Sequence, residues 1–179
     1  MDDFTEQILD ERAVYTGKVF TVVERNIQIA PDKTATWEVI KKRGDNSVAI
    51  VAVDDEHNVF LVEEYFGAIN KRELSLPKGR IDDGEDAETA ANRELQEEIG
   101  MRGNLTKLAD VSVSPGYLTQ ITTLFLAQDL QTSQLQGDEE HHFAIRKMPL
   151  AQAIAMCQNG EISEARTITA LLLAEKQLT

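Results

Sequence analysis

The sequence predicts an α/β or α+β sandwich, in which strands surround a central helix and further helices follow at the C-terminus. Four segments rich in apolar and β-branched residues are typical of strands, and they cover residues 14–29, 34–42, 47–53 and 58–65. Residues 86–99 have the apolar spacing of an amphipathic helix. A chain of 179 residues is long enough for one domain with a substantial core, and short for two.

The N-terminal part, residues 1–45, is expected to be a polar arm followed by a β-hairpin. Residues 1–12 are predicted as a short helix or a mobile arm, and a turn at residues 30–33 joins the two strands of the hairpin. An isolated hairpin is unstable in water, so this one must pack on something else. Residues 46–179 are expected to form the body of the same domain.

Five further elements are predicted after the central helix: strands at residues 105–114, 122–128 and 145–148, and helices at 149–157 and 163–178. The first of these helices begins at Pro149, because proline is tolerated in the first turn of a helix. Residues 131–142 are polar and acidic and contain few residues that favour regular structure, so they are predicted to be a loop.

Composition narrows the class of protein. The formal net charge of -13 argues against a general nucleic-acid surface and against binding to anionic membranes. It also means that an anionic substrate can bind only where a metal ion or a few positively charged side chains compensate the negative charge. Cys157 is the single cysteine, which excludes an internal disulfide. The N-terminus lacks the features of a signal peptide and no apolar run has the length of a membrane span, so we expect a cytoplasmic protein.

The most informative stretch runs from residue 79 to residue 101 and reads GRIDDGEDAETAANRELQEEIGM. On a helix, Glu94, Glu97 and Glu98 fall on one side, because positions three and four apart are neighbours. Like charges placed in this way destabilise a helix unless a cation offsets them. Carboxylate oxygens on a rigid element suit Mg²⁺, or Mn²⁺ as a substitute, and such ions also bind substrate phosphate oxygens.

These residues match the pattern G-x5-E-x7-R-E-U-x-E-E-x-G-U, with U aliphatic, at every position. The stretch therefore resembles the Nudix box, the signature of hydrolases that cleave nucleoside diphosphates linked to another moiety. The resemblance implies an α/β/α sandwich with a mixed sheet, extended here by the N-terminal β-hairpin. Gly79, Glu85, Arg93 and Gly100 are its structural positions, and we expect Glu85 and Arg93 to pair and to lock the loop onto the helix.

The resemblance also implies the metal ligands and the general base. Glu94, Glu97 and Glu98 would bind the metal together with the backbone carbonyl of Lys78, and Glu97 is also a candidate catalytic group. Related ADP-ribose hydrolases take the base from an acidic loop beyond the box, which corresponds here to residues 137–141. We therefore expect Glu139, or next Glu140, to be the base; the alternative is that this run is only a solvated charged loop.

The expected substrate-binding residues lie outside the box: Trp37, Glu38, Lys42, Arg43, Arg72, Pro115 and Gly116. Pro115 and Gly116 follow the box at the interval seen in the ADP-ribose branch. Trp37 would stack on adenine, or it is an ordinary hairpin residue that covers the core. Lys42 or Arg43 would contact phosphate or ribose.

One departure from the pattern bears on specificity. Typical ADP-ribose hydrolases carry an arginine where this chain has Phe66, and Arg72 is a candidate replacement. The loss favours the branch that hydrolyses several ADP compounds, including ADP-ribose, NADH and adenosine dinucleotides, to release AMP. The resemblance further implies a homodimer that pairs through the N-terminal β segment. The alternatives are a hydrolase of another nucleotide sugar, such as GDP-mannose, and a nucleotide-binding sensor without turnover.

Overall fold

The computed structural model describes residues 4–42, 44, 46–137 and 144–179. The chain divides into two compact units. The first comprises Met1–Asp45 with Ser112–Ile121, and the second comprises Asn46–Val111 with Thr122–Thr179. Among the described residues, none of the helices has the length and apolar character needed to cross a membrane.

The second unit is built on a sheet whose described strands run in the order β10-β5-β4-β9-β8, with β6 paired to β5 and β7 paired to β4. The strands are β4 (Asn46–Val53), β5 (Asn58–Phe66), β6 (Lys71–Ser75), β7 (Lys78–Arg80), β8 (Met101–Ser112), β9 (Ile121–Thr132) and β10 (Ala144–Pro149). Short β7 pairs antiparallel with the beginning of β4, from Ser47 to Ala49. This pairing attaches the start of the glycine-bounded stretch to the centre of the sheet.

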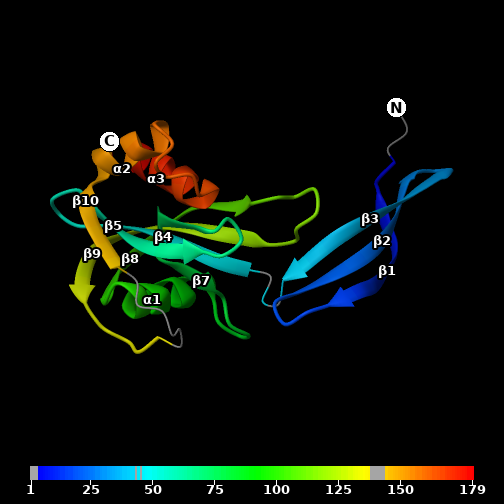
Figure 1. The fold of residues 1–179 in the computed structure, drawn as a ribbon, viewed down its shortest axis with the longest axis horizontal. Helices are drawn as coiled ribbons and strands as arrows, with labels where there is room; N and C mark the ends of the chain where they lie inside the picture. Colours follow the sequence, from blue (N-terminus) through cyan, green and yellow to red (C-terminus); the bar gives the residue numbers. More distant parts are fainter. Residues whose placement is uncertain (1–3, 43, 45, 138–143) are drawn as a thin grey trace. The chain divides into compact units, whose positions relative to one another are not determined.

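Helices cover both faces of this sheet. Helix α1 (Ala87–Glu98) lies on one face, and α2 (Leu150–Gln158) and α3 (Ala165–Leu178) lie on the other, as Figure 1 shows. Successive residues of β4 alternate between the two cores: Val48 and Ile50 pack with α1, whereas Val51 packs with α2 and α3. A strand that is buried on both faces has a continuous run of apolar residues, which explains the sequence SVAIVAV at residues 47–53. The α+β sandwich expected from the sequence is confirmed.

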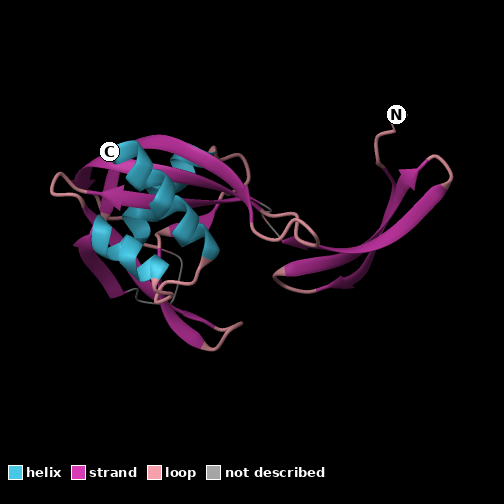
Figure 2. Ribbon diagram, turned by 90° about the horizontal axis from the view of Figure 1, so that it is seen from above, coloured by secondary structure: helices cyan, strands magenta, loops and turns pink. Residues whose placement is uncertain are grey.

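The first unit contains a three-stranded antiparallel sheet, in the order β1-β2-β3, rather than the expected arm and hairpin. Its strands are β1 (Gln7–Thr16), β2 (Phe20–Ala30) and β3 (Lys33–Lys42). In the described part of the chain, this sheet carries no helix (Figure 2). A turn at Gly17, whose N–H donates to the carbonyl of Phe20 at 2.9 Å, splits the single strand predicted at residues 14–29.

Most of β1 was not predicted from the sequence because its apolar residues do not alternate with its polar ones. Every residue of this strand is exposed, so it lacks the alternation of apolar and polar residues that marks a half-buried strand. Cross-strand charge pairs hold it to β2 instead: Arg25 contacts Glu11 at 2.7 Å and Arg12 contacts Glu24 at 2.5 Å. Such pairs between neighbouring strands stabilise a sheet modestly.

The segment before the glycine-bounded stretch also differs from expectation. No strand was predicted between residues 65 and 79, but the chain turns back after β5 and forms β6, which pairs antiparallel with β5. Asn70 takes a left-handed backbone conformation in this hairpin, with φ of 53°. Asparagine is one of the residues that tolerate this conformation, so the turn that begins at Gly67 needs no second glycine at its last position.

Candidate active site

Helix α1 begins and ends at residues suited to those positions. Asp86 is the N-cap, and its carboxylate accepts a hydrogen bond from the backbone N–H of Thr89 at 2.8 Å. At the other end, Gly100 has a φ of 69°, the left-handed conformation in which helices commonly stop. Leu95 is fully buried in the core, whereas Glu97 and Glu98 are only partly covered. The predicted helix and its acidic side are confirmed.

The guanidinium of Arg93 is the centre of the acidic cluster. Its Nε and Nη2 donate to the two carboxylate oxygens of Glu85 at 3.1 and 3.0 Å. Its Nη1 donates to Glu94 at 2.7 Å and to Glu97 at 3.4 Å. Nη2 also donates to the backbone carbonyl of Arg80 at 2.8 Å, which joins β7 to the helix.

These contacts shift the ionisation of both partners. Hydrogen bonds from Arg93 hold the pKa of Glu85 below its ordinary value, against the opposing effect of burial. The hydrogen bond to Glu85 in turn raises the pKa of Arg93, so the guanidinium stays charged. The expected pairing of Glu85 with Arg93 is therefore present, and it ties the loop before the helix to the helix itself.

Glycine is required at position 79 because the carboxylate of Glu94 occupies the space where a side chain would begin. A Cβ built on Gly79 would overlap the carboxylate atoms of Glu94. Glu94 is only 8% exposed, so it has little room to move aside. The contact between β7 and α1 thus depends on a residue without a side chain.

Glu98 lies beside Lys78 at the same junction. Its carboxylate accepts a hydrogen bond from the backbone N–H of Lys78 at 3.3 Å. Burial raises the pKa of Glu98 to about 9, and the neighbouring charges of Glu94 and Glu64 add to this effect while Lys78 opposes it. A buried carboxyl group surrounded by other carboxylates is costly to ionise unless a cation binds there.

The residues at this junction have the ligand chemistry of a divalent-cation site, but not its convergent arrangement. Among the described residues, no three His, Cys, Asp or Glu side chains converge as they do around a bound ion. The reason is visible in the contacts: Arg93 holds Glu94 and Glu97, while Glu98 accepts from Lys78. The available ligand atoms are nevertheless carboxylate oxygens, and one guanidinium cannot neutralise all of them. Mg²⁺ and Mn²⁺ prefer oxygen ligands of this kind.

Comparisons with known proteins agree with this geometry. The NUDIX domain model matches residues 44–171. The chain belongs to the NUDIX family. It is 33% identical over 172 residues to the ADP compounds hydrolase NudE of Escherichia coli (strain K12), covering 96% of this chain and 92% of that protein. It is 27% identical over 174 residues to the ADP-ribose pyrophosphatase of Bacillus subtilis (strain 168), covering 96% and 93%. A crystal structure of an ADP compounds hydrolase superposes with a TM-score of 0.88 at 31% identity, covering 98% of this chain and 95% of that one.

The NUDIX chain brings together two expected substrate-binding segments that are far apart in sequence. Trp37, Glu38 and Lys42 lie on β3, and Pro115 and Gly116 lie in the connection that follows β8. The backbone N–H of Ile40 donates to the carbonyl of Tyr117 at 2.6 Å, and the N–H of Thr119 donates back to the carbonyl of Ile40 at 3.1 Å. Both segments therefore belong to the first unit.

Trp37 does not cover a core in this NUDIX chain, since it is 52% exposed. Arg72 is exposed on β6, in the second unit. Arg43, Glu139 and Glu140 lie outside the described residues, so their predicted roles stay predictions. The adenine contact of Trp37 and the phosphate contact of Lys42 stay predictions as well.

Sequence reasoning missed a partly buried ion pair next to the NUDIX box. The ammonium of Lys78 contacts the carboxylate of Glu64 and lies 3.0 Å from the hydroxyl of Ser75. It also lies 5.3 Å from the ring centre of Phe66, the residue that stands where an arginine was expected. Glu64 was not singled out because it lies on β5, 14 residues before Lys78, and no local spacing relates the two.

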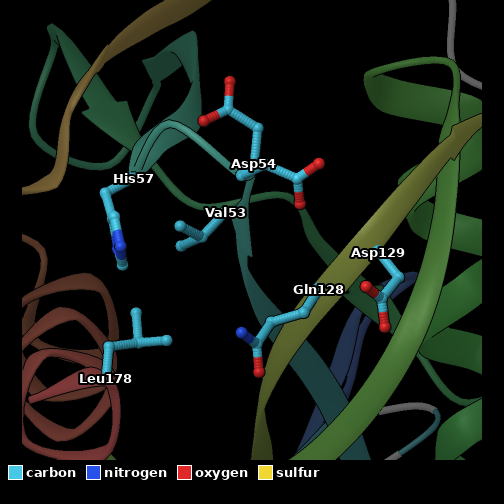
Figure 3. A pocket seen from close by; sticks show the side chains of 7 residues that line it. Val53, Asp54, His57, Gln128, Asp129 and Leu178 are labelled. Atoms are coloured by element: carbon cyan, nitrogen blue, oxygen red, sulfur yellow. The ribbon is translucent and has the colours of Figure 1, made fainter.

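A separate cavity of about 240 Å³ lies at the far end of β4, away from the NUDIX box (Figure 3). Its lining residues are Val53, Asp54, Asp55, His57, Gln128, Asp129 and Leu178. Burial alone would raise the pKa of Asp54, but hydrogen bonds from Lys147 and Asn58 outweigh it and lower the value to about 2. The carboxylate of Asp129 accepts from Asn104 at 2.8 Å. The carboxylates of Asp54 and Asp129 therefore already have hydrogen-bond partners. We interpret them as structural and not as part of a second site. His57 is exposed.

Replacing Arg93 by lysine tests the central contact of the box. A lysine cannot reach the oxygens of Glu85, Glu94 and Glu97 together, so we expect Arg93→Lys to lower the free energy of unfolding by about 2–3 kcal/mol. Urea-induced unfolding measures this difference. Arg146→Lys is the matched control, because Arg146 pairs with Glu63 at a more exposed site and should change stability by less than about 1 kcal/mol. Equal effects of the two substitutions would show that the Arg93 contacts carry no special weight.

Proposed function

We propose that this NUDIX chain hydrolyses the diphosphate linkage of ADP compounds, such as ADP-ribose, NADH and adenosine dinucleotides, and releases AMP. One observation carries the proposal: the complete box folds into a cluster in which Arg93 joins Glu85, Glu94 and Glu97 beside the partly covered Glu98. The names of its relatives, an ADP compounds hydrolase and an ADP-ribose pyrophosphatase, support the substrate class.

A divalent cation, Mg²⁺ or in its place Mn²⁺, would neutralise charge on the diphosphate and make water a better nucleophile. Glu94, Glu97 and Glu98, with the backbone carbonyl of Lys78, would hold it. Arg93 keeps Glu94 and Glu97 on one side of the helix, and Gly79 lets β7 approach that side closely. A protein with a net charge of -13 repels anionic substrates at long range, so this local compensation is needed for binding.

The remaining expected roles belong to the same proposal. Glu139, or next Glu140, would act as the general base, and Glu97 is a further candidate catalytic group. On the substrate side, Pro115 and Gly116 would shape the loop that lies beside β3. A cytoplasmic location stays a prediction from the sequence.

The first test is a substrate panel. The purified protein is incubated with Mg²⁺ and ADP-ribose, NADH, a diadenosine oligophosphate, GDP-mannose or a nucleoside triphosphate, and the products are separated by chromatography. We expect AMP from the ADP compounds and no product after chelation of the metal. Preferred turnover of GDP-mannose would support the alternative nucleotide sugar, and tight binding without turnover would support the sensor.

Glu98→Gln isolates the metal-binding role. The amide keeps the shape of the side chain but loses the negative charge, so we expect kcat to fall by at least about 100-fold, as loss of a directly acting group commonly does. The melting temperature should stay equal or rise, because the neutral side chain is cheaper to bury. An unchanged rate of hydrolysis at saturating Mg²⁺ would remove Glu98 from the metal site.

Trp37→Ala tests the adenine contact. Stacking on a base is worth about 1–3 kcal/mol, so we expect KM for ADP-ribose to rise about 5- to 100-fold with little change in kcat. Because Trp37 is 52% exposed, the substitution should leave the melting temperature nearly unchanged. If KM is the same as in the unmodified protein, the indole does not bind adenine.

We also propose that two copies of the chain associate through the first unit. The hairpin of β1 and β2, including its turn, exposes six large apolar side chains, each 42–58% accessible: Ile8, Leu9, Val14, Tyr15, Val19 and Phe20. A sheet of this size with so little buried surface is marginal in water, and exposed apolar patches commonly mark interfaces. A second copy would cover this surface.

Sedimentation velocity tests the association. We expect a dimer for the unmodified chain and a monomer for Tyr15→Asp, because a charge in the centre of an apolar interface is costly to bury. Leu172→Asp on α3 is the control, since Leu172 is also exposed (43%) but lies outside the first unit. A monomeric unmodified protein, or a Tyr15→Asp dimer of unchanged stability, would contradict the proposal.

A further inference from the structure

Helix α1 has two carboxylates at its C-terminal end, where the helix dipole disfavours negative charge. Glu97 and Glu98 lie in the last turn, where the unsatisfied carbonyl groups carry partial negative charge, and this turn contains no basic residue. Helices are usually stabilised here by lysine or arginine, which bind the terminal carbonyl groups. A positive charge at this position would also attract the two glutamates and compete with a metal ion for them.

A neutral segment takes the place of such a cation. The segment Ser133–Leu135, which follows β9, donates hydrogen bonds to the last turn. The side-chain amide of Gln134 donates to the carbonyl of Gln96 at 3.0 Å and to the carbonyl of Glu97 at 3.4 Å. The backbone N–H of Leu135 donates to the carbonyl of Gln96 at 3.2 Å, and that of Ser133 donates to the carbonyl of Gly100 at 2.9 Å. All of these donors are uncharged.

The glycine that ends the helix makes room for this segment. A Cβ built on Gly100 would lie 2.5 Å from Oε1 of Gln134. Gly100 therefore meets two requirements: it adopts the left-handed conformation, with φ of 69°, and it lets the Gln134 side chain lie against the helix end. The hydroxyl of Ser133 donates to the side chain of Gln96 at 2.7 Å, which adds a further contact to the same turn.

We propose that Gln134 is a positioning residue for the metal site. Its amide binds the last turn of α1 and so holds the backbone of Glu97 and Glu98 in place, while adding no positive charge that would compete for their carboxylates. The inference rests on the proposed metal-binding function of these glutamates and deepens it. Residues that orient metal ligands without touching the metal commonly change metal affinity by about 10- to 100-fold.

Two substitutions of Gln134 distinguish the effect of its hydrogen bonds from the effect of its lack of charge. Gln134→Met keeps the length of the side chain and removes the donor, so we expect Mn²⁺ affinity to fall about tenfold and the metal-free melting temperature to fall by about 2–4 °C. Gln134→Lys restores a donor and suits the helix dipole, so the melting temperature should recover. Mn²⁺ affinity should nevertheless remain about tenfold weaker, because the ammonium competes with the metal.

Free Mn²⁺ is measured by electron paramagnetic resonance, and melting is followed in the presence of chelator. Gln177→Lys on α3 is the matched control for added charge, because α3 lies on the opposite face of the sheet from α1, and it should bind Mn²⁺ like the unmodified protein. A purely structural role of Gln134 predicts instead that affinity follows the melting temperature across all variants.

The outcomes are distinguishable. Unmodified affinity in Gln134→Met would overturn the positioning role, and unmodified affinity in Gln134→Lys would overturn the requirement for a neutral donor. If the unmodified protein itself neither binds Mn²⁺ nor hydrolyses any substrate of the panel, the proposed function fails. Binding and hydrolysis by the unmodified protein with no effect of either substitution would contradict only this inference.

Discussion

The structure around the box depends on how one guanidinium compensates several carboxylates. Arg93 contacts Glu85, Glu94 and Glu97 and also the carbonyl of Arg80, so it joins the strand, the loop and the helix. A lysine would offer a point charge without this planar set of donors. Removing either side of the cluster would leave uncompensated charge in a partly buried place, which costs more than the pair itself contributes.

Arg93 does not neutralise all the negative charge of the cluster. The uncompensated negative charge determines what the cluster can bind. Glu98 stays outside the reach of Arg93, and its pKa is raised to about 9 because it is buried near other carboxylates. The last turn of the helix adds partial negative charge and is bound by neutral donors from Ser133–Leu135. A site with excess negative charge and oxygen donors, whose last helical turn is bound by uncharged donors, favours a divalent cation.

The two units differ in how they obtain stability. In the second unit, helices cover both faces of the sheet, and residues such as Leu95 and Leu171 are fully buried. The first unit buries few apolar side chains, and its outer strand is held by pairs such as Glu11 with Arg25. Exposed ion pairs and strand hydrogen bonds contribute little compared with a packed core. This difference is the physical reason why we propose that the first unit serves association and substrate contacts.

The sequence by itself determined the helix with its acidic side, the loop before it, the family and the sandwich, because these depend on spacings of three and four residues or on alternation within one strand. Only the tertiary structure decided features that join distant residues: the pairing of Lys78 with Glu64, the contact between β3 and the connection near Tyr117, and the binding of Gln134 to the end of α1. Strand β1 belongs with them, because a strand held by charges on its neighbour has no apolar pattern of its own. Such contacts form only when packing brings the segments together, and no local periodicity records them.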